Sequence, residues 1–243
     1  MAMRFLEKLA GKQKELYSDN AATVVFFGDS VTQGCFECDI DENGEIDVTH
    51  DTASSYSVKF VKLLQTYYPR AQINYINSGI SGDGTIRGLA RVDQAVVRYK
   101  PDLTVISFGL NDCGKGMAGL EGYRTRLGEI FSLVRDCGSD IIFLAPCIMN
   151  TYVHRLIPHE SLKQIAESCM RNQKEGVLAA YFQAAQEVGS RYGVRFCNCY
   201  GKWERMQKAG VDTTALLSNY INHPTRDMHW LLANTLLDTL FES

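Results

Sequence analysis

Apolar runs alternate with amphipathic segments along this chain, and the alternation predicts its architecture. The run "TVVFFG" has the composition of a strand without polar alternation, which is typical of a strand buried on both faces of a parallel sheet. Strands are expected at 23–28, 71–79, 102–109, 139–147 and 194–200. Helices are expected from the start to about Asp19, over 54–69, 85–101, 121–138 and 161–193, and after Thr225.

Strands that alternate with helices imply right-handed crossovers and a mostly parallel sheet between two layers of helices. The expected fold class is therefore α/β, a three-layer α/β/α sandwich. No internal repeat or linker-like stretch interrupts the pattern, so residues 1–243 are read as a single domain. The acidic, turn-rich segment 35–53 is expected to form a surface loop or a small hairpin. Because it directly follows the turn at 28–30, it either covers a site at that turn or simply lies on the surface.

Composition narrows the classes of partner. The chain has 25 basic and 28 acidic residues and a net charge of -3, which provides no electrostatic basis for binding nucleic acid or an anionic membrane. No apolar run approaches the roughly 20 residues of a membrane helix, and the charged N-terminal segment is unlike a secretion signal. These features predict a soluble, cytoplasmic protein without a transmembrane segment, and they are compatible with a homo-oligomer.

The chain contains eight cysteines, and in a cytoplasmic protein they are expected to be reduced. Two closely spaced pairs suggest a thiolate metal site as one alternative, made by Cys35, Cys38, Cys197 and Cys199. Cys-x-Cys is a poor spacing for zinc, and no histidine-rich segment accompanies it. We therefore expect buried thiols, and neither a metal nor a cofactor.

Polar, glycine-bearing turns follow the first three expected strands, and a further polar group precedes the last helix. They read "GDS" at 28–30, "SGISGDG" at 78–84, "GLND" at 109–112 and "NHP" at 222–224. Strand-end turns of a doubly wound sheet meet at the same edge, where ligands bind. Each residue also has a non-catalytic interpretation: Ser30 as a helix cap, Gly82 and Asn111 as turn residues and His223 as a surface histidine. Taken singly, this interpretation is favoured for Gly82 and His223. Together, these residues favour an enzyme.

In this order the motifs resemble the Ser, Gly, Asn and His blocks of the GDSL or SGNH family of esterases and acylhydrolases. The resemblance implies a flavodoxin-like SGNH hydrolase fold and cofactor-free hydrolysis of a small-molecule ester. It implies that Ser30 is the nucleophile and His223 the base that accepts its proton. The backbone N–H groups of Ser30 and Gly82 and the side chain of Asn111 would then form the oxyanion hole.

The sequence departs from the family pattern at the group that orients the histidine. The family usually has an aspartate three residues before it, where this chain has Tyr220. Asn219 or a backbone carbonyl would leave a Ser–His dyad with a neutral partner, and this is the expectation we favour. Asp212 and Asp227 are the alternatives.

His229 competes with His223 as the base, but its place before the apolar "WLLA" indicates packing within the last helix. Asp29 and Asp112 adjoin the expected nucleophile and oxyanion residues. Aspartates in turns bond to nearby backbone, so both are expected to hold these turns in shape.

The resemblance favours a small acyl group, such as an acetyl ester of a carbohydrate. Lysophospholipid and thioester substrates are alternatives within the family. From a different class, a non-catalytic α/β module that binds a carbohydrate or an anion is the other alternative, because the usual aspartate is missing. Ester turnover distinguishes the two classes.

Overall fold

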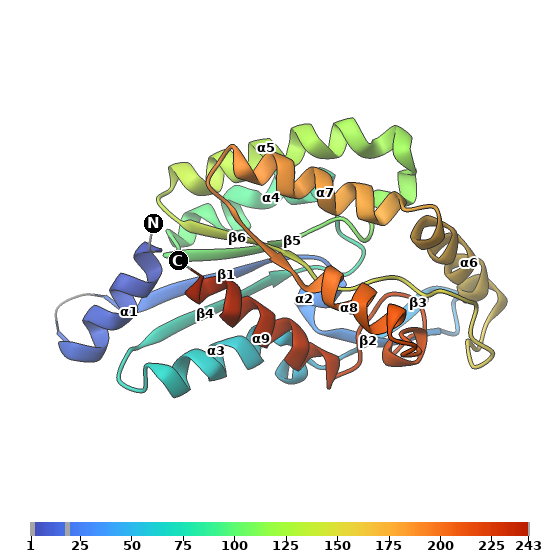
Figure 1. Cartoon of the computed structure of the whole chain (residues 1–243), viewed down its shortest axis with the longest axis horizontal. Helices are drawn as coiled ribbons and strands as arrows, with labels where there is room; N and C mark the ends of the chain where they lie inside the picture. Colours follow the sequence, from blue (N-terminus) through green and yellow to red (C-terminus); the bar gives the residue numbers. More distant parts are fainter. Residues whose placement is uncertain (1–2, 18–19, 243) are drawn as a thin grey trace.

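A parallel sheet of five strands forms the centre of the computed structural model, which describes residues 3–17 and 20–242 (Figure 1). The strand order across the sheet is β4-β1-β5-β6-β7, and every pairing within it is parallel. The strands are β1 (Ala22–Gly28), β4 (Ile73–Gly79), β5 (Leu103–Ser107), β6 (Asp140–Ala145) and β7 (Arg195–Asn198). The first strand of this sheet lies between the second and the third, which is the flavodoxin-like order, and the expected fold class is confirmed.

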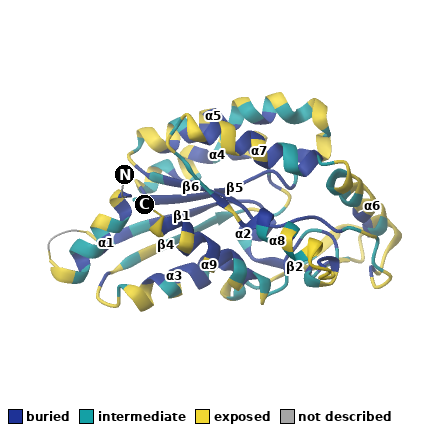
Figure 2. Ribbon diagram, viewed as in Figure 1, coloured by how far each residue is buried: buried dark blue, intermediate teal, exposed yellow. Residues whose placement is uncertain are grey.

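Helices cover both faces of the sheet (Figure 1). One layer contains α4 (Thr85–Ala95), α5 (Leu120–Asp136) and α7 (Val177–Ser190), and the other contains α3 (Tyr56–Tyr67) and α9 (Met228–Phe241). Helix α1 (Arg4–Lys14) contacts β1, and α8 (Cys199–Lys208) contacts α9 and β6. Every residue of β5 is buried, as expected for a central strand that is covered on both faces (Figure 2).

Two expected helices differ from the structure. The segment 161–193 contains α6 (Glu160–Lys174) and α7 rather than one long helix. Gly176 separates them with φ 73°, and a left-handed glycine of this kind ends a helix. Helix α1 ends at Lys14, and its expected end near Asp19 lies outside the described residues. Helix α8 follows β7 directly, in a segment where we expected none.

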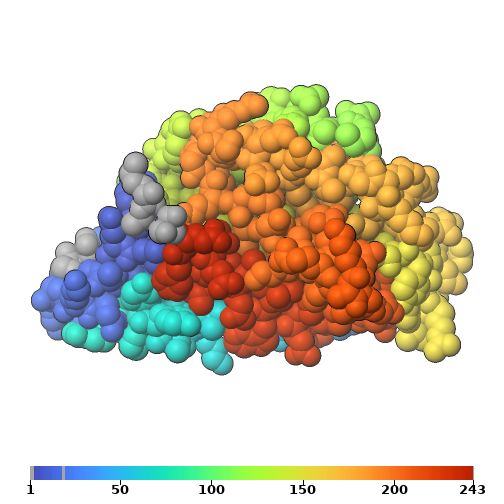
Figure 3. All heavy atoms as spheres, viewed as in Figure 1, coloured from blue at the N-terminus to red at the C-terminus, as the bar shows by residue number. Residues whose placement is uncertain are grey.

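The acidic segment after the first turn forms an antiparallel hairpin, β2 (Cys35–Ile40) and β3 (Ile46–His50). It lies beyond the carboxyl ends of the parallel strands, on the side of the molecule where α6 is found (Figure 1). In Figure 3 the orange-red segment before α9 lies beside the yellow segment that leads into α6, and the backbone N–H of Asn150 donates to the carbonyl of Ile221 between them.

Within residues 3–17 and 20–242, every helix is too short or too polar to cross a bilayer.

Candidate active site

Ser30 lies where β1 ends and the short helix α2 (Ser30–Gln33) begins. The turn between them requires a glycine, because a Cβ at Gly28 would lie 2.4 Å from Thr32 Oγ1 and 2.5 Å from the carbonyl oxygen of Ser107. Asp29 caps α2 by accepting a hydrogen bond of 3.0 Å from the N–H of Val31. The expectation that Asp29 holds this turn is therefore met in the structure.

Burial raises the pKa of Asp29 to about 7, and the charges of Asp112 and Asp83 add to the rise. The Val31 N–H lowers it in part. This carboxyl group therefore titrates near neutral pH, directly beside Ser30.

His223 reaches Ser30 from the other end of the chain, in the loop before α9. Its Nε2 lies 2.9 Å from Ser30 Oγ, and its Nδ1 lies 2.9 Å from the backbone carbonyl oxygen of Phe36 in β2. The Cys38 thiol is farther away, at 3.8 Å from Nδ1. Because a carbonyl oxygen only accepts, Nδ1 carries the proton and Nε2 is free to accept from the serine hydroxyl. This is the tautomer that a general base needs.

Burial lowers the pKa of His223 to about 4, while its contact with the Phe36 carbonyl and the charge of Glu37 raise it in part. The imidazole is therefore neutral at physiological pH. A neutral imidazole can take a proton from Ser30, whereas a charged one cannot.

Asn219 orients the loop around His223 rather than its ring. Its Oδ1 accepts hydrogen bonds from the backbone N–H groups of Ile221, Asn222 and His223, at 3.0, 2.9 and 2.9 Å. Tyr220, at the position of the family aspartate, has φ 56° and its ring stacks on His154 at a centroid distance of 4.0 Å. The group on the ring nitrogen is the Phe36 carbonyl, so the preference for a neutral partner fits the geometry.

The two aspartates considered as alternatives lie elsewhere. Asp212 accepts from the Tyr152 hydroxyl at 2.7 Å and from the N–H of Ala215 at 3.2 Å, which directs its carboxylate away from His223. Asp227 is exposed at the start of α9. Local backbone and tyrosine contacts hold the Asp212 carboxylate and Asp227 faces solvent, so neither of these alternatives contacts the His223 ring in the described structure.

His229 is fully buried and does not reach Ser30. Its Nδ1 accepts from the N–H of Tyr56 at 2.8 Å, and its ring packs against Phe36 at a centroid distance of 4.9 Å. Its expected packing role fits this geometry.

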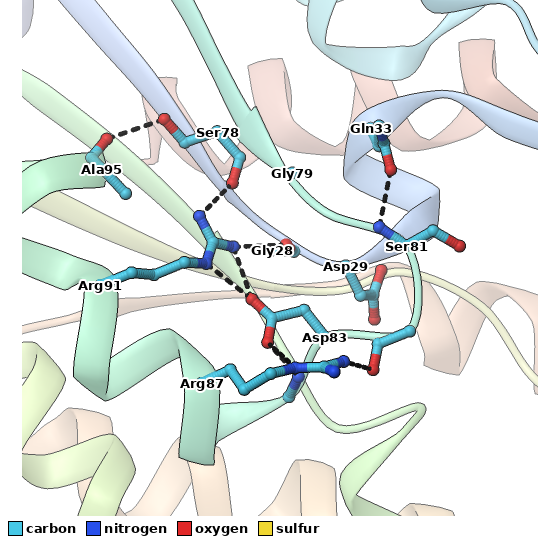
Figure 4. Close-up of polar contacts among 12 residues, drawn as sticks. Gly28, Asp29, Gln33, Ser78, Gly79, Ser81, Asp83, Arg87, Arg91 and Ala95 are labelled. Atoms are coloured by element: carbon cyan, nitrogen blue, oxygen red, sulfur yellow. Dashed lines mark hydrogen bonds and ion pairs between the residues drawn. The ribbon is translucent and has the colours of Figure 1, made fainter.

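The second glycine turn carries Gly82, which has φ 70°. Its neighbours are held on both sides: Gln33 Oε1 accepts from the N–H of Ser81 at 2.6 Å, and Asp83 forms an ion pair of 2.7 Å with Arg91 (Figure 4). Arg91 also donates to the carbonyl oxygens at the ends of β1 and β4, at 3.2 and 2.8 Å. The turn is therefore tied to the strands that flank it.

Asn111 lies on the third turn, and its Nδ2 donates to the carbonyl oxygen of Asp83 at 2.7 Å. Asp112 accepts from the N–H and the hydroxyl of Thr85 at 2.9 and 2.5 Å, so it fastens this turn to α4 as expected. Burial is the main cause that raises the pKa of Asp112.

A cavity of about 130 Å³ joins Ser30 and His223 to Gly82 and Asn111. Among the described residues, the backbone N–H groups of Ser30 and Gly82 have no hydrogen-bond acceptor, so both remain available to a ligand. The rest of the lining comes from the hairpin, α6 and the His223 loop: Cys38, Ile46, Val48, Ser81, Leu162, Ile165, Asn219, Ile221 and Asn222.

Sequence reasoning did not identify the apolar lining from α6 or the role of Phe36. For the hairpin, the sequence offered one indication of a place at the site, because the segment directly follows the turn that carries Ser30. The structure adds a second indication of a binding surface, because the apolar side chains of Ile46 and Ile165 line the cavity and remain partly exposed.

The four cysteines of the alternative metal site have different surroundings. Cys38 lines the cavity and Cys35 contacts His50 Nδ1 at 3.4 Å, whereas Cys197 and Cys199 are buried in the core. In the part of the chain that the structure describes, no group of three or more His, Cys, Asp or Glu residues could hold a metal ion.

A model of the GDSL-like lipase/acylhydrolase family matches residues 26–231. The chain belongs to this family. An arylesterase of Vibrio mimicus is 35% identical over 88 residues, which are 34% of this chain and 41% of the relative. An acetylxylan esterase of Geobacillus stearothermophilus is 37% identical over 90 residues, 37% of this chain and 39% of the relative. These matches span about two fifths of the relatives' length.

Solved structures show the same fold over most of the chain. A crystal structure of an acetylxylan esterase from Geobacillus stearothermophilus has a TM-score of 0.65 at 21% identity and covers 91% of this chain and 95% of its own. An alpha/beta hydrolase enzyme from the metagenome of Lake Arreo has a TM-score of 0.66 at 21% identity, covering 91% and 96%. Variants of a serine, an aspartate and a histidine of the acetylxylan esterase are described as catalytic mutants.

Proposed function

We propose that this protein hydrolyses a carboxylic ester through an acyl intermediate on Ser30, with His223 as the general base. The observation that carries the proposal is the pair of contacts to the His223 ring, 2.9 Å to Ser30 Oγ and 2.9 Å to the Phe36 carbonyl. These contacts favour catalysis over the binding-module alternative, because a ligand-binding loop needs neither a buried neutral imidazole nor a fixed tautomer.

In the first step, Ser30 Oγ attacks the ester carbonyl carbon while His223 Nε2 takes the hydroxyl proton. The tetrahedral intermediate collapses, the bond to the alcohol breaks, and His223 returns the proton to the departing alcohol oxygen. Water then attacks the acyl-serine, again with His223 taking a proton, and the acid leaves as Ser30 regains its hydrogen. No metal or cofactor takes part in these steps.

Negative charge develops on the carbonyl oxygen in both tetrahedral intermediates. The free N–H groups of Ser30 and Gly82 and the Nδ2 group of Asn111 border the same cavity and would donate to this oxygen. Loss of one such donor typically lowers kcat by ~10²–10³. Asn111→Ala should therefore reduce turnover strongly while its effect on KM stays small.

The cavity size favours a short acyl group. Its volume of about 130 Å³ lies below the roughly 300–1,000 Å³ of drug-sized ligand sites, which favours acetyl over the long chain of a lysophospholipid. A second hollow of about 260 Å³ shares Gly82 and Asn111 with the first and is also lined by Arg87 and Lys115. We assign the acyl group to the first hollow and a polar, hydroxyl-bearing alcohol such as a carbohydrate to the second, in keeping with the acetylxylan esterase relative.

Hydrolysis of p-nitrophenyl esters from acetate to octanoate tests the proposal with wild type, Ser30→Ala and His223→Ala. We expect highest turnover with acetate and losses of at least about 10³-fold in both variants, since neither half of the dyad works alone. Intact-mass measurement after rapid quenching should show an acetyl adduct that is absent from Ser30→Ala. An inactive wild type, or an active Ser30→Ala variant, would refute the assignment.

A further inference from the structure

The carbonyl that orients His223 belongs to a segment outside the central sheet. Phe36 lies in β2, whose one strand partner among residues 3–17 and 20–242 is β3, in the two-stranded hairpin. A two-stranded hairpin is marginally stable by itself, so a ring partner on it needs further support. In most serine hydrolases a carboxylate side chain performs this task, and a side chain can adjust by rotation. A backbone carbonyl is placed only as well as its strand is.

Arg226 lies three residues after His223 and links strand β2 to the loop that carries His223. Its guanidinium forms a two-point contact with Glu37, at 2.6 and 3.1 Å, and donates to Asp51 at 2.9 Å. The same guanidinium lies 4.3 Å from the centre of the Phe36 ring. Glu37 directly follows Phe36, and Asp51 directly follows β3. Arg226 therefore contacts the hairpin near the start of its first strand and just after the end of its second strand.

A second contact thus joins the same two segments of the chain. Glu37, the residue after Phe36, pairs with Arg226, which lies three residues after His223. Two-point arginine–carboxylate contacts fix relative orientation as well as distance. A shift of β2 away from the loop would break the Glu37 contact and the Phe36 contact together. The arrangement is open to solvent at Arg226, whose side chain is 39% exposed, and such exposed pairs add little to global stability.

Resting on the proposed function, we propose that Arg226 is a positioning residue: its contacts with Glu37 and Asp51 hold the Phe36 carbonyl on His223 Nδ1 and so maintain the tautomer that accepts the proton of Ser30. Arg226 thereby performs, through the hairpin, the orienting task of the absent aspartate. It touches neither the substrate nor the reacting atoms.

The test compares Arg226→Gln, Arg226→Lys, Glu37→Gln and the double variant Glu37→Gln/Arg226→Gln. Arg124→Gln is the matched control, because Arg124 also contacts two carboxylates, those of Glu121 and Glu187, on the opposite layer of helices. Urea unfolding first establishes that each variant is folded. Two measurements follow at pH 7.5: p-nitrophenyl acetate kinetics, and ¹⁵N NMR of the histidine rings, with His223 assigned from a His223→Gln variant.

In Arg226→Gln we expect kcat to fall by about 10- to 100-fold with KM changed less than about threefold, because misplacement of a catalytic group by ~1 Å costs up to ~10²-fold. The His223 ring should change from a single Nδ1–H form to a mixture of tautomers. Arg226→Lys should recover part of kcat, since lysine can pair with one carboxylate but lacks the planar fork. Glu37→Gln should reproduce most of the loss, and the double variant should lose no more than Arg226→Gln alone.

Kinetics and ring signals of Arg226→Gln that match those of Arg124→Gln would overturn the positioning role, while a loss that is seen only in KM would assign Arg226 to substrate binding instead. Failure of the proposed function is seen separately. If the wild type does not hydrolyse esters in a Ser30-dependent manner, the ester assignment falls, and the NMR comparison still decides whether Arg226 orients the ring.

Discussion

Asn219 holds the loop that carries His223 through a single side-chain oxygen, and Asn219→Ala removes that oxygen. Three backbone N–H groups lose their acceptor, those of Ile221, Asn222 and His223. Ile221 and His223 are almost completely buried, at 3% and 5% exposed, so water replaces the lost contacts poorly. A buried donor without its partner costs about 1–3 kcal/mol. Two such donors predict a loss of about 2–6 kcal/mol in the free energy of unfolding.

Urea unfolding followed by fluorescence and circular dichroism measures this loss as a lower midpoint at an unchanged slope. Asn219→Asp keeps an acceptor for all three N–H groups and should lose much less. Ser218→Ala is the matched control, because the Ser218 hydroxyl makes only a long contact of 3.4 Å to the Pro224 carbonyl. Asn219→Ala should also lose ester turnover at urea concentrations where this variant is still folded. An Asn219→Ala midpoint equal to that of Ser218→Ala would refute the view that this oxygen holds the loop.

Three further predictions follow from burial and close packing. Since the pKa of His223 is about 4 and the base works only when neutral, its titration should lower kcat/KM only as the pH drops through about 4–5. Because Asp29 titrates near pH 7 beside Ser30, the profile is measured in Asp29→Asn as well, and an acid limb near pH 7 that persists in this variant would contradict a carbonyl-oriented dyad. Gly28→Ala should lower the unfolding temperature and the turnover together, at a cost of about 1–3 kcal/mol or more, because the methyl group would lie 2.5 Å from the Ser107 carbonyl; a variant as stable as wild type in calorimetry would disprove the clash. The pKa of Asp29 is about 7 in the folded chain and near 4 unfolded, so its favourable contribution is complete below pH 4 and is lost as the pH rises to 7. Asp29→Asn keeps the cap without the titration, and its stability relative to wild type should therefore rise between pH 4 and 8, by up to roughly 4 kcal/mol; parallel stability curves would refute this.

Much of the architecture could be predicted because it depends on local pattern. Apolar runs buried on both faces predicted strands such as β1 and β5, and the helices between them implied parallel crossovers. Once the sheet is parallel, its strand ends share an edge, and this placed the turns of Ser30, Gly82 and Asn111 together. Their catalytic roles, and that of His223, remain predictions that the kinetic experiments test.

The errors arose where one local signal competed with another. The strong helical spacing of 161–193 concealed the left-handed Gly176 that separates α6 from α7. Helix α8 follows β7 without a loop, capped by the Asn198 side chain that accepts from the N–H of Gly201 at 2.8 Å. Asn198 was placed within the strand expected at 194–200, so its capping role and the helix that follows it were missed.

The α/β class, the sheet edge at which the polar turns meet and the missing carboxylate three residues before His223 all follow from local residue patterns. These patterns restrict the partner of the His223 ring to a few nearby side chains or a backbone carbonyl. The fold selects among them by bringing the Phe36 carbonyl to within 2.9 Å of Nδ1 from 187 residues away in the chain. Residue type could not mark this group in advance, because every residue carries a carbonyl group. Its contact with the ring depends on where the hairpin packs, and Arg226 joins the hairpin to the loop of His223 through its contacts with Glu37 and Asp51.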